Sequence, residues 1–327
     1  MTTFDAVRAG FRIARRYPGI GAIETIWRTA FTILVVLVIL TGSSFFLKNV
    51  ILSDPELKML RSKVPVFVSA EVQRLLIRYG PDLWHLFLFV SIFSGVMWLL
   101  FASVFRPGIV GMLADAFERE RQNGSSNSTG RGFSKDIRSF FGRIGMVNFT
   151  YVFFSALVVI LSVGVFWGSV FLGVHLPAVI APWVTIVCVT VGLTLMFFIW
   201  AVIDLVTDMA QIAVVFEELS FSASIRRTAK VIQRRFGAVI GIGLVIFVLR
   251  CLSALIFGLL NMAANFVLGA VSMPLAIATG VVFWFIQSVL LYYLFVVNLA
   301  SFACLFEPQT IVASHPLPLS EKIIYEH

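Results

Sequence analysis

Two carboxylates, Asp204 and Asp208, lie four residues apart near the end of an apolar run, and Gln211 continues nearly the same helical face. Acidic side chains that face one another at a membrane boundary can bind a cation or relay protons. Such residues also mark where a span ends, or pair with neighbouring bases, which here are Arg227 and Lys230. We therefore name Asp204 and Asp208 as a possible ion or substrate site and keep the structural alternative open.

Arg250 is the one charged residue clearly inside an apolar run, 13 residues after Gly237. In a helix that spacing is roughly 20 Å, which leaves about 10 Å to the far interface. An ionisable side chain at this depth is a candidate for a substrate or anion site. Its long stem also allows it to reach the outer headgroups or to hydrogen-bond a neighbour. Gln287 lies at a similar depth and is the predicted partner, with Thr190 as another possibility.

Residues for catalysis or cofactor binding form no recognisable pattern. The four histidines are scattered, and no His-x-x-x-His, Gly-x-Ser-x-Gly, Walker or dinucleotide motif is present. The three cysteines lie in apolar runs without the spacing of metal ligands. Hydrophilic segments are too short to hold a catalytic domain. We predict a protein that is not an enzyme and that binds no metal and no cofactor.

Six long apolar runs must position these polar residues. Hydrophobic residues make up 59% of the chain and charged residues 13%, and the mean hydropathy of +0.97 is far above that of soluble proteins. Each run reaches the about 20 residues that a helix needs to cross a hydrocarbon core, and only helices satisfy the backbone there within one segment. The predicted fold class is an all-α polytopic membrane protein with six transmembrane helices. The runs cover residues 29–47, 83–105, 147–172, 182–203, 237–262 and 278–306.

The six runs repeat in pairs, and each pair follows a basic stretch and ends on the dipeptide Phe-Glu. We predict three helical hairpins, each preceded by an amphipathic cytoplasmic helix. Because each unit crosses the membrane twice, the units are related by an axis along the membrane normal, around which they either enclose a cavity or simply pack. The predicted divisions of the single membrane domain, 1–327, are pseudo-repeats 1–118, 133–217 and 221–307, a flexible cytoplasmic linker over 119–132 and an extended tail over 308–327.

The basic stretches of the first and third copies match most closely, since a shift of 218 positions lays cation on cation. Their cations form one stripe of a helix and their apolar residues form another. We expect these helices to lie flat on the inner leaflet, with the apolar side in the headgroup boundary and the cations toward anionic phosphates. Ordinary juxtamembrane charge is the alternative. The predicted lipid-facing basic residues are Arg8, Arg12, Arg16, Arg226, Lys230 and Arg234.

Charge sets the predicted topology. Of the 25 Lys and Arg residues, 18 lie on the side that holds both termini, six lie on the other side, and one is Arg250. The positive-inside rule places both termini in the cytoplasm, so the net charge of +8 needs no nucleic-acid partner. On the opposite side, residues 48–81 include an amphipathic run over 69–79, which predicts a short helix on the outer surface or a cap that binds a partner. Three glutamates that recur after the hairpins are expected to bind the basic helices of neighbouring units, namely Glu118, Glu217 and Glu307.

The segment Ala213–Glu218, followed by Phe221–Thr228, resembles a junction in a known group of proteins. These are the bacterial glycerophosphodiester phosphodiesterases in which a six-span membrane domain precedes the catalytic domain. The resemblance covers the six-span layout and this one junction. No catalytic domain follows here, so the resemblance implies neither the phosphodiesterase activity nor any functional residue.

The sequence therefore predicts a multi-pass protein of a bacterial inner membrane without catalysis of its own. The expected function is that of a scaffold or accessory subunit that interacts with membrane lipids, above all anionic ones, or with other membrane proteins. The alternative is a transporter or channel with a central polar site near Arg250, Asp204 and Asp208.

Overall fold

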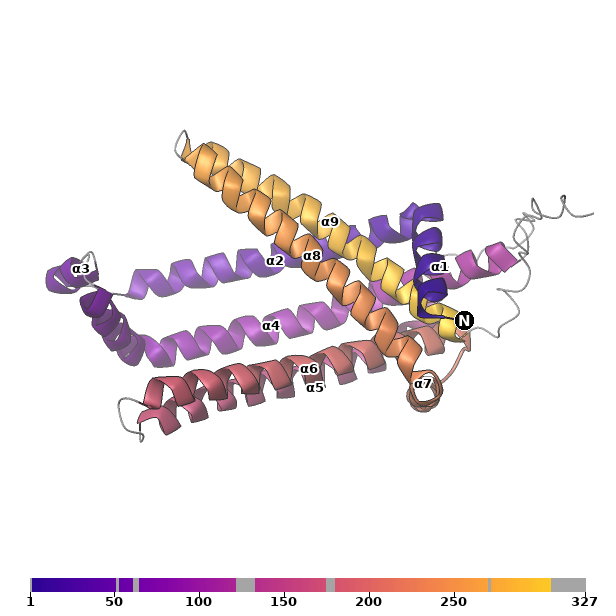
Figure 1. Cartoon of the computed structure of the whole chain (residues 1–327), viewed down its shortest axis with the longest axis horizontal. Coiled ribbons are helices and arrows are strands. Elements are labelled where there is room, and N and C mark those ends of the chain that lie inside the picture. Colours follow the sequence, from indigo (N-terminus) through magenta and orange to yellow (C-terminus); the bar gives the residue numbers. More distant parts are fainter. Residues whose placement is uncertain are drawn as a thin grey trace, which may run out of the picture. The chain divides into compact units, whose positions relative to one another are not determined.

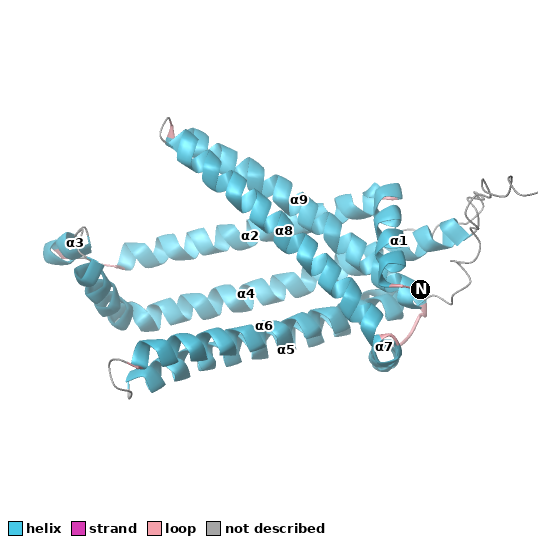
Figure 2. Ribbon diagram, in the orientation of Figure 1, coloured by secondary structure: helices cyan, strands magenta, loops and turns pink. Residues whose placement is uncertain are grey.

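In a computed structural model of the chain, every regular element of the described residues is a helix and no strand occurs among them (Figures 1 and 2). Six of these helices are long and apolar enough to cross a membrane. The all-α prediction is confirmed to this extent, and the six helices indicate a multi-pass integral membrane protein. The described residues are 2–50, 53–60, 65–121, 133–174, 180–269 and 272–306, so the predicted tail, Glu307 and residues 122–132 of the predicted linker lie outside them.

The helices follow one another with short connections. Their bounds are α1 (Thr3–Arg16), α2 (Pro18–Asn49), α3 (Asp54–Leu60), α4 (Pro65–Arg121), α5 (Phe133–Val174), α6 (Ala181–Phe216), α7 (Phe221–Arg234), α8 (Phe236–Gly269) and α9 (Met273–Phe306). Contacts divide the chain into a smaller unit, Trp27–Phe101, and a larger unit made of Met1–Ile26 and Ala102–His327. Each unit is described below by itself.

The larger unit is built around two pairs of long helices, since α5 runs beside α6 and α8 runs beside α9 (Figure 1). The two short helices lie across the ends of the long ones, where α1 packs on α9 and α8, and α7 packs on α6. We call this end of the larger unit the basic end. The core lies here, because the longest stretches that are buried without interruption are residues 207–215 of α6 and 294–306 of α9.

The sequence of α1 explains both of its ends. Thr2 caps the helix, since its side chain accepts a hydrogen bond from the backbone N–H of Asp5 at 3.3 Å and its own N–H donates to the Asp5 carboxylate at 3.0 Å. Arg15 and Arg16 occupy the last turn, where cations suit the negative end of the helix. Pro18 then begins α2, because proline fits the first turn of a new helix and not the interior of an old one.

The buried side of α1 corrects one expectation. Ala6, Gly10, Ile13 and their neighbours pack on the protein itself, mainly on α9, so this side does not lie in the headgroup boundary. The residues that allow this are small, which lets two helix backbones approach closely. The six predicted lipid-facing cations, on α1 and α7, are all exposed.

A pH experiment tests the cap of α1. Hydrogen bonds from the Thr2 side chain, and then from its backbone N–H, lower the pKa of Asp5 below its ordinary value of 3.8. A carboxylate with a lowered pKa in the folded state stabilises above its unfolded pKa, and this stabilisation is lost as the pH falls through the folded pKa. We expect Asp5→Asn to lower the thermal stability at neutral pH, and the difference from wild type to vanish on acidification below 3.8. A difference that persists in acid would contradict this role.

The second basic stretch is not a separate helix, although the sequence predicts one over 133–143. It forms the first turns of α5, which continues into its span without a break. No proline follows this stretch as Pro18 follows α1, so that local cause of a helix end is missing here. The third stretch does form its own helix, α7, although no proline follows it either; α7 ends at Arg234, and its C-cap Arg235 has a backbone φ of −127° before α8 begins.

The smaller unit contains most of α2, all of α3 and the first part of α4. Gly42 of α2 lies against the Leu86 side chain of α4, and Phe46 meets Tyr79 edge-on with ring centroids 6.1 Å apart. Residues 69–79 are helical but belong to α4, so the separate outer helix is not found. Figure 1 shows that the first part of α4 is bent. This part of the sequence contains Gly80-Pro81, and proline is the usual cause of a kink in a helix.

Candidate functional site

A buried ion pair marks the candidate site in the larger unit. Nη1 of Arg106, on α4, lies 3.5 Å from Oδ1 of Asp208, on α6, and the two side chains are only 3% and 2% exposed. The guanidinium carbon of Arg106 also lies 4.3 Å from the centroid of the Phe295 ring on α9, within the range of a cation–π contact. Three long helices are therefore joined at one point near the basic end.

An amide pair continues the site one turn farther along α6. Nε2 of Gln211 donates a hydrogen bond of 2.7 Å to Oδ1 of Asn148, on α5, and both residues are completely buried. We call Arg106, Asn148, Asp208 and Gln211 the polar core. Within the described residues, the buried atoms of the polar core without a hydrogen-bond partner include Nε of Arg106, Nδ2 of Asn148 and Oε1 of Gln211. Buried polar atoms of this kind usually find a partner, which is often a water molecule or a polar ligand.

The structure corrects the predicted partners of Asp208. The sequence suggested Arg227 or Lys230, but the base beside Asp208 is Arg106. Arg227 instead binds Glu217, with Nε 2.9 Å from each carboxylate oxygen and Nη2 2.7 Å from Oε1. Such two-pronged geometry suits the planar guanidinium, so Arg227 is engaged elsewhere.

Asp204 and Arg250 lie near the polar core without belonging to it. Asp204 is half-buried one turn before Asp208, and both charges act on the hydroxyl group of Tyr151. The guanidinium carbon of Arg250, on α8, is 5.8 Å from the centroid of the Phe295 ring, which Arg106 also contacts. The predicted bond from Arg250 to Gln287 stays a prediction.

Arg106 was not predicted as a site residue, although the internal repeat carries a signal for it. Arg106 and Phe295 each lie 11 residues before the phenylalanine of a Phe-Glu pair, and Asp208 and Asn298 each lie eight residues before one. One of these matched pairs meets in space, since the Arg106 guanidinium lies on the Phe295 ring. Counting back from the Phe-Glu pairs would have indicated this contact, but not the ion pair, whose members lie at different repeat positions.

The glutamates after the hairpins bind the basic helices in part. Glu217 takes Arg227 of α7, as described, and Glu120 lies 3.2 Å from Arg16 of α1. Glu120 was not among the three predicted residues, and Glu307 lies outside the described residues. These pairs are partly exposed, so each is expected to contribute less than about 1 kcal/mol.

The two charges of the polar core neutralise each other. One positive and one negative charge face each other in a buried setting, so Asp208 does not offer a free carboxylate to a passing cation. No group of three or more His, Cys, Asp and Glu side chains that could hold a metal ion comes together in the described part of the chain. What the arrangement does is join α4, α5, α6 and α9 by directional contacts.

No protein-family model, curated protein or solved structure matches the chain.

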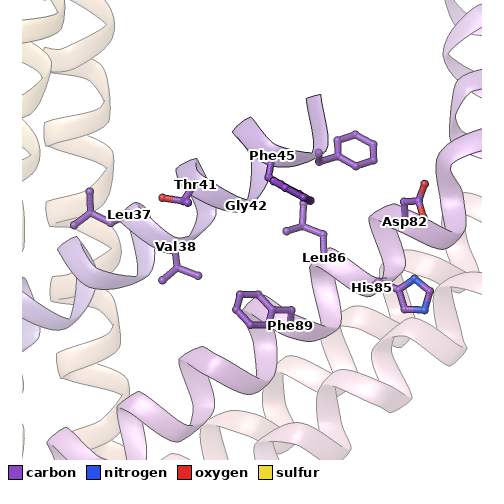
Figure 3. Close-up of a pocket in the computed structure, with 10 residues that line it drawn as sticks. Leu37, Val38, Thr41, Gly42, Phe45, Asp82, His85, Leu86 and Phe89 are labelled. Atoms are coloured by element: carbon purple, nitrogen blue, oxygen red, sulfur yellow. The ribbon is translucent and has the colours of Figure 1, made fainter. Parts of the chain in front are cut away.

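A groove of about 720 Å³ lies in the smaller unit between α2 and α4 (Figure 3). Val38 on α2 and Leu86 and Phe89 on α4 point into the space between the two helices. Thr41, Asp82 and His85 are the polar members of an otherwise apolar lining. Several of the lining side chains are exposed, among them Phe45 at 71%, so the groove is an open apolar surface and not a closed chamber.

One substitution tests the amide pair. Gln211→Leu removes the donor that satisfies the buried Asn148 carbonyl oxygen, which should cost about 1–3 kcal/mol of unfolding free energy. The double variant Asn148→Leu/Gln211→Leu should recover part of this loss, because neither amide is then left alone. Chemical unfolding in mixed micelles measures both. Gln233→Leu, at an exposed position of α7, is the matched control and should change little.

Proposed function

We propose that the protein is a non-catalytic scaffold or accessory subunit of a membrane, which contacts anionic lipids or other membrane proteins through its basic end. One observation carries this proposal. The short helices α1 and α7 are packed on the ends of the long helices, while their cations remain exposed. Each cation near an anionic surface contributes about 1 kcal/mol, so six of them held in fixed positions make a strong surface contact.

The packing of α1 and α7 also supports a threefold internal repeat of hairpins. A shift of 218 positions relates their buried residues as well as their cations, pairing Ala6 with Ser224, Gly10 with Thr228 and Ile13 with Val231. The two helices therefore use the same face against the protein. In this proposal each unit is an amphipathic segment followed by two spans, and the basic end lies on the cytoplasmic side of a bacterial inner membrane.

Purification from native membranes tests the proposed function. The expected result is a stable stoichiometric protein partner, together with enrichment of anionic lipids over their share of the membrane. The variant Arg226→Gln/Lys230→Gln should reduce the lipid enrichment without unfolding the protein, because both side chains are exposed. A solitary protein without lipid preference that moves a solute across liposomes would overturn the proposal.

A transporter with a central polar site near Arg250, Asp204 and Asp208 is the second candidate. The observation in its favour is that atoms of Asn148 and Gln211 are buried without partners, as in a site that receives a polar solute. Solute uptake into liposomes should then be abolished by Asp208→Asn and kept by Glu217→Gln. Absence of uptake by the wild-type protein would remove this candidate.

A further inference from the structure

A cavity of about 430 Å³ opens at the basic end, where the chain turns from α1 into α2. It is lined by Arg16 and Tyr17, by the start of α2, and by residues of α4 that include Arg119. Phe133, the first residue of α5, completes the lining. All of these residues belong to the larger unit, so their arrangement is that of one compact body.

The cavity carries cationic donors that are available to a ligand. The Arg16 side chain is 60% exposed and uses one of its five N–H groups on Glu120, at 3.2 Å. Arg119 is exposed and makes no ion pair within the described ranges of the chain. Since α2 begins in the lining, the positive end of its backbone dipole adds to the potential. Two guanidinium groups from different helices can therefore reach one anionic group between them.

The remainder of the lining suits a lipid better than a free anion. Ile20, Met112 and Ala116 form an apolar part of the cavity, at the point where the apolar span of α2 begins. Tyr17 adds an amphipathic ring, which favours the level of the headgroups, and Phe133 enlarges the apolar part of the lining. The cavity therefore suits a molecule that has both an anionic head and an apolar tail.

The charge balance indicates which anionic head fits. Asp115 also lines the cavity and Glu120 lies 3.2 Å from Arg16, so two carboxylates oppose the two arginines. A phosphodiester carries one negative charge, whereas a phosphomonoester carries about −1.5 to −2 at neutral pH. The single charge meets less repulsion from Asp115 and Glu120 than the double charge does.

We infer that this cavity binds the phosphodiester group of one glycerophospholipid between Arg16 and Arg119, with the acyl chains along the start of α2. The inference rests on the proposed function only in placing the basic end at a lipid surface. It adds a discrete, saturable site to what would otherwise be a diffuse electrostatic contact.

The space beside Gly19 allows a test that leaves every charge in place. A Cβ atom added to Gly19 would meet only the Met112 methyl group, at 4.0 Å, so a larger side chain can enter the cavity without a backbone clash. Gly19→Leu should therefore fill the cavity and exclude the lipid. Gly21→Leu is the matched control on the same helix, because nothing lies within 4 Å of the added Cβ atom there.

The experiment titrates the full-length protein in neutral detergent with phosphatidylglycerol and counts bound lipid by native mass spectrometry. The wild type should bind one molecule per chain saturably, and less phosphatidic acid, which is a phosphomonoester. Arg16→Gln/Arg119→Gln and Gly19→Leu should each weaken binding at least about 10-fold, as expected for the loss of charge-assisted hydrogen bonds or of space. Gly21→Leu should bind as the wild type does, and a folded elution profile is required of every variant.

Three results would overturn the site. The first is that Arg226→Gln/Lys230→Gln, which removes two cations outside the cavity, weakens lipid binding as much as Arg16→Gln/Arg119→Gln does. The lipid would then be held by general electrostatic attraction and not by this cavity, and the proposed function would stay intact. Displacement of the lipid by inorganic phosphate at equal concentration would assign the cavity to free phosphate. Absence of any saturable phosphatidylglycerol binding would remove the site, whereas the proposed function fails only if native purification finds neither a partner nor anionic lipid.

Discussion

Replacing Asp208 by leucine should destabilise the protein by about 3–5 kcal/mol, because it leaves the Arg106 charge buried without its partner. The guanidinium group cannot escape by losing its proton, since its pKa lies far above neutral pH. Its stacking on Phe295 persists in the variant, but a cation–π contact of about 2 kcal/mol does not replace an ion pair. The midpoint of chemical unfolding in mixed micelles measures this loss.

The double variant Arg106→Met/Asp208→Leu distinguishes the loss of the whole ion pair from the loss of one of its two charges. Replacing a buried ion pair by apolar residues of similar volume is often neutral, so the double variant should recover most of the stability that the single variant loses. Asp204→Leu, one turn away on the same helix and half-buried, is the control and should cost much less. If Asp208→Leu and Asp204→Leu cost the same, or if the double variant is as unstable as the single one, the ion pair does not hold these helices together.

The six membrane helices could be predicted from the sequence because their cause is local. Each run is long enough to cross the hydrocarbon core, and no other backbone structure satisfies its hydrogen bonds there. The ends of α1 have an equally local cause but were not predicted, since Thr2-x-x-Asp5 forms a cap and Pro18 begins the next helix. By contrast, a continuous α5 was not predicted, because a basic stretch looks the same whether or not the helix continues beyond it.

The polar core could not be predicted in the same way, because its ion pair joins residues 102 positions apart and its amide pair joins residues 63 positions apart. Arg106 looks like a cation that marks the end of a span, and only the packing of α4 beside α6 turns it into the partner of Asp208. Asn148 carries no charge and lies in a stretch counted as apolar. The sequence therefore indicated one member of the ion pair, Asp208, and one member of the amide pair, Gln211, but the partner of neither.

The apolar side of α1 shows a limit that is specific to membrane proteins. Hydrophobic periodicity indicates that one face of a helix avoids water, but a lipid boundary and a protein surface are both apolar. What distinguishes them here is residue size, since Ala6, Gly10 and Ala14 place small side chains toward α9. Small residues are favoured where backbones approach, whereas a helix in the headgroup boundary gains most from large side chains.

Gly10→Leu should separate α1 from α9, at a cost of about 3 kcal/mol, near the upper end for overpacking. A Cβ atom at residue 10 would meet the Ser301 hydroxyl group and would lie 2.7 Å from the Val297 carbonyl oxygen and 3.1 Å from the Ser301 backbone nitrogen. The backbone atoms cannot move aside, and the Ser301 hydroxyl group already donates a hydrogen bond of 2.7 Å to Val297. The helix must therefore shift away as a whole.

Hydrogen exchange of the α1 amides measures this separation, and we expect fast exchange throughout α1 while the α9 amides beyond the contact stay protected. Gly21→Leu is the control, because a Cβ atom there meets nothing within 4 Å. If α1 keeps its protection in Gly10→Leu, the helix is not held by this contact and its cations are not fixed in position. The proposed surface contact would then lose its physical basis, since its strength depends on cations that are already in place when the membrane or a partner is met.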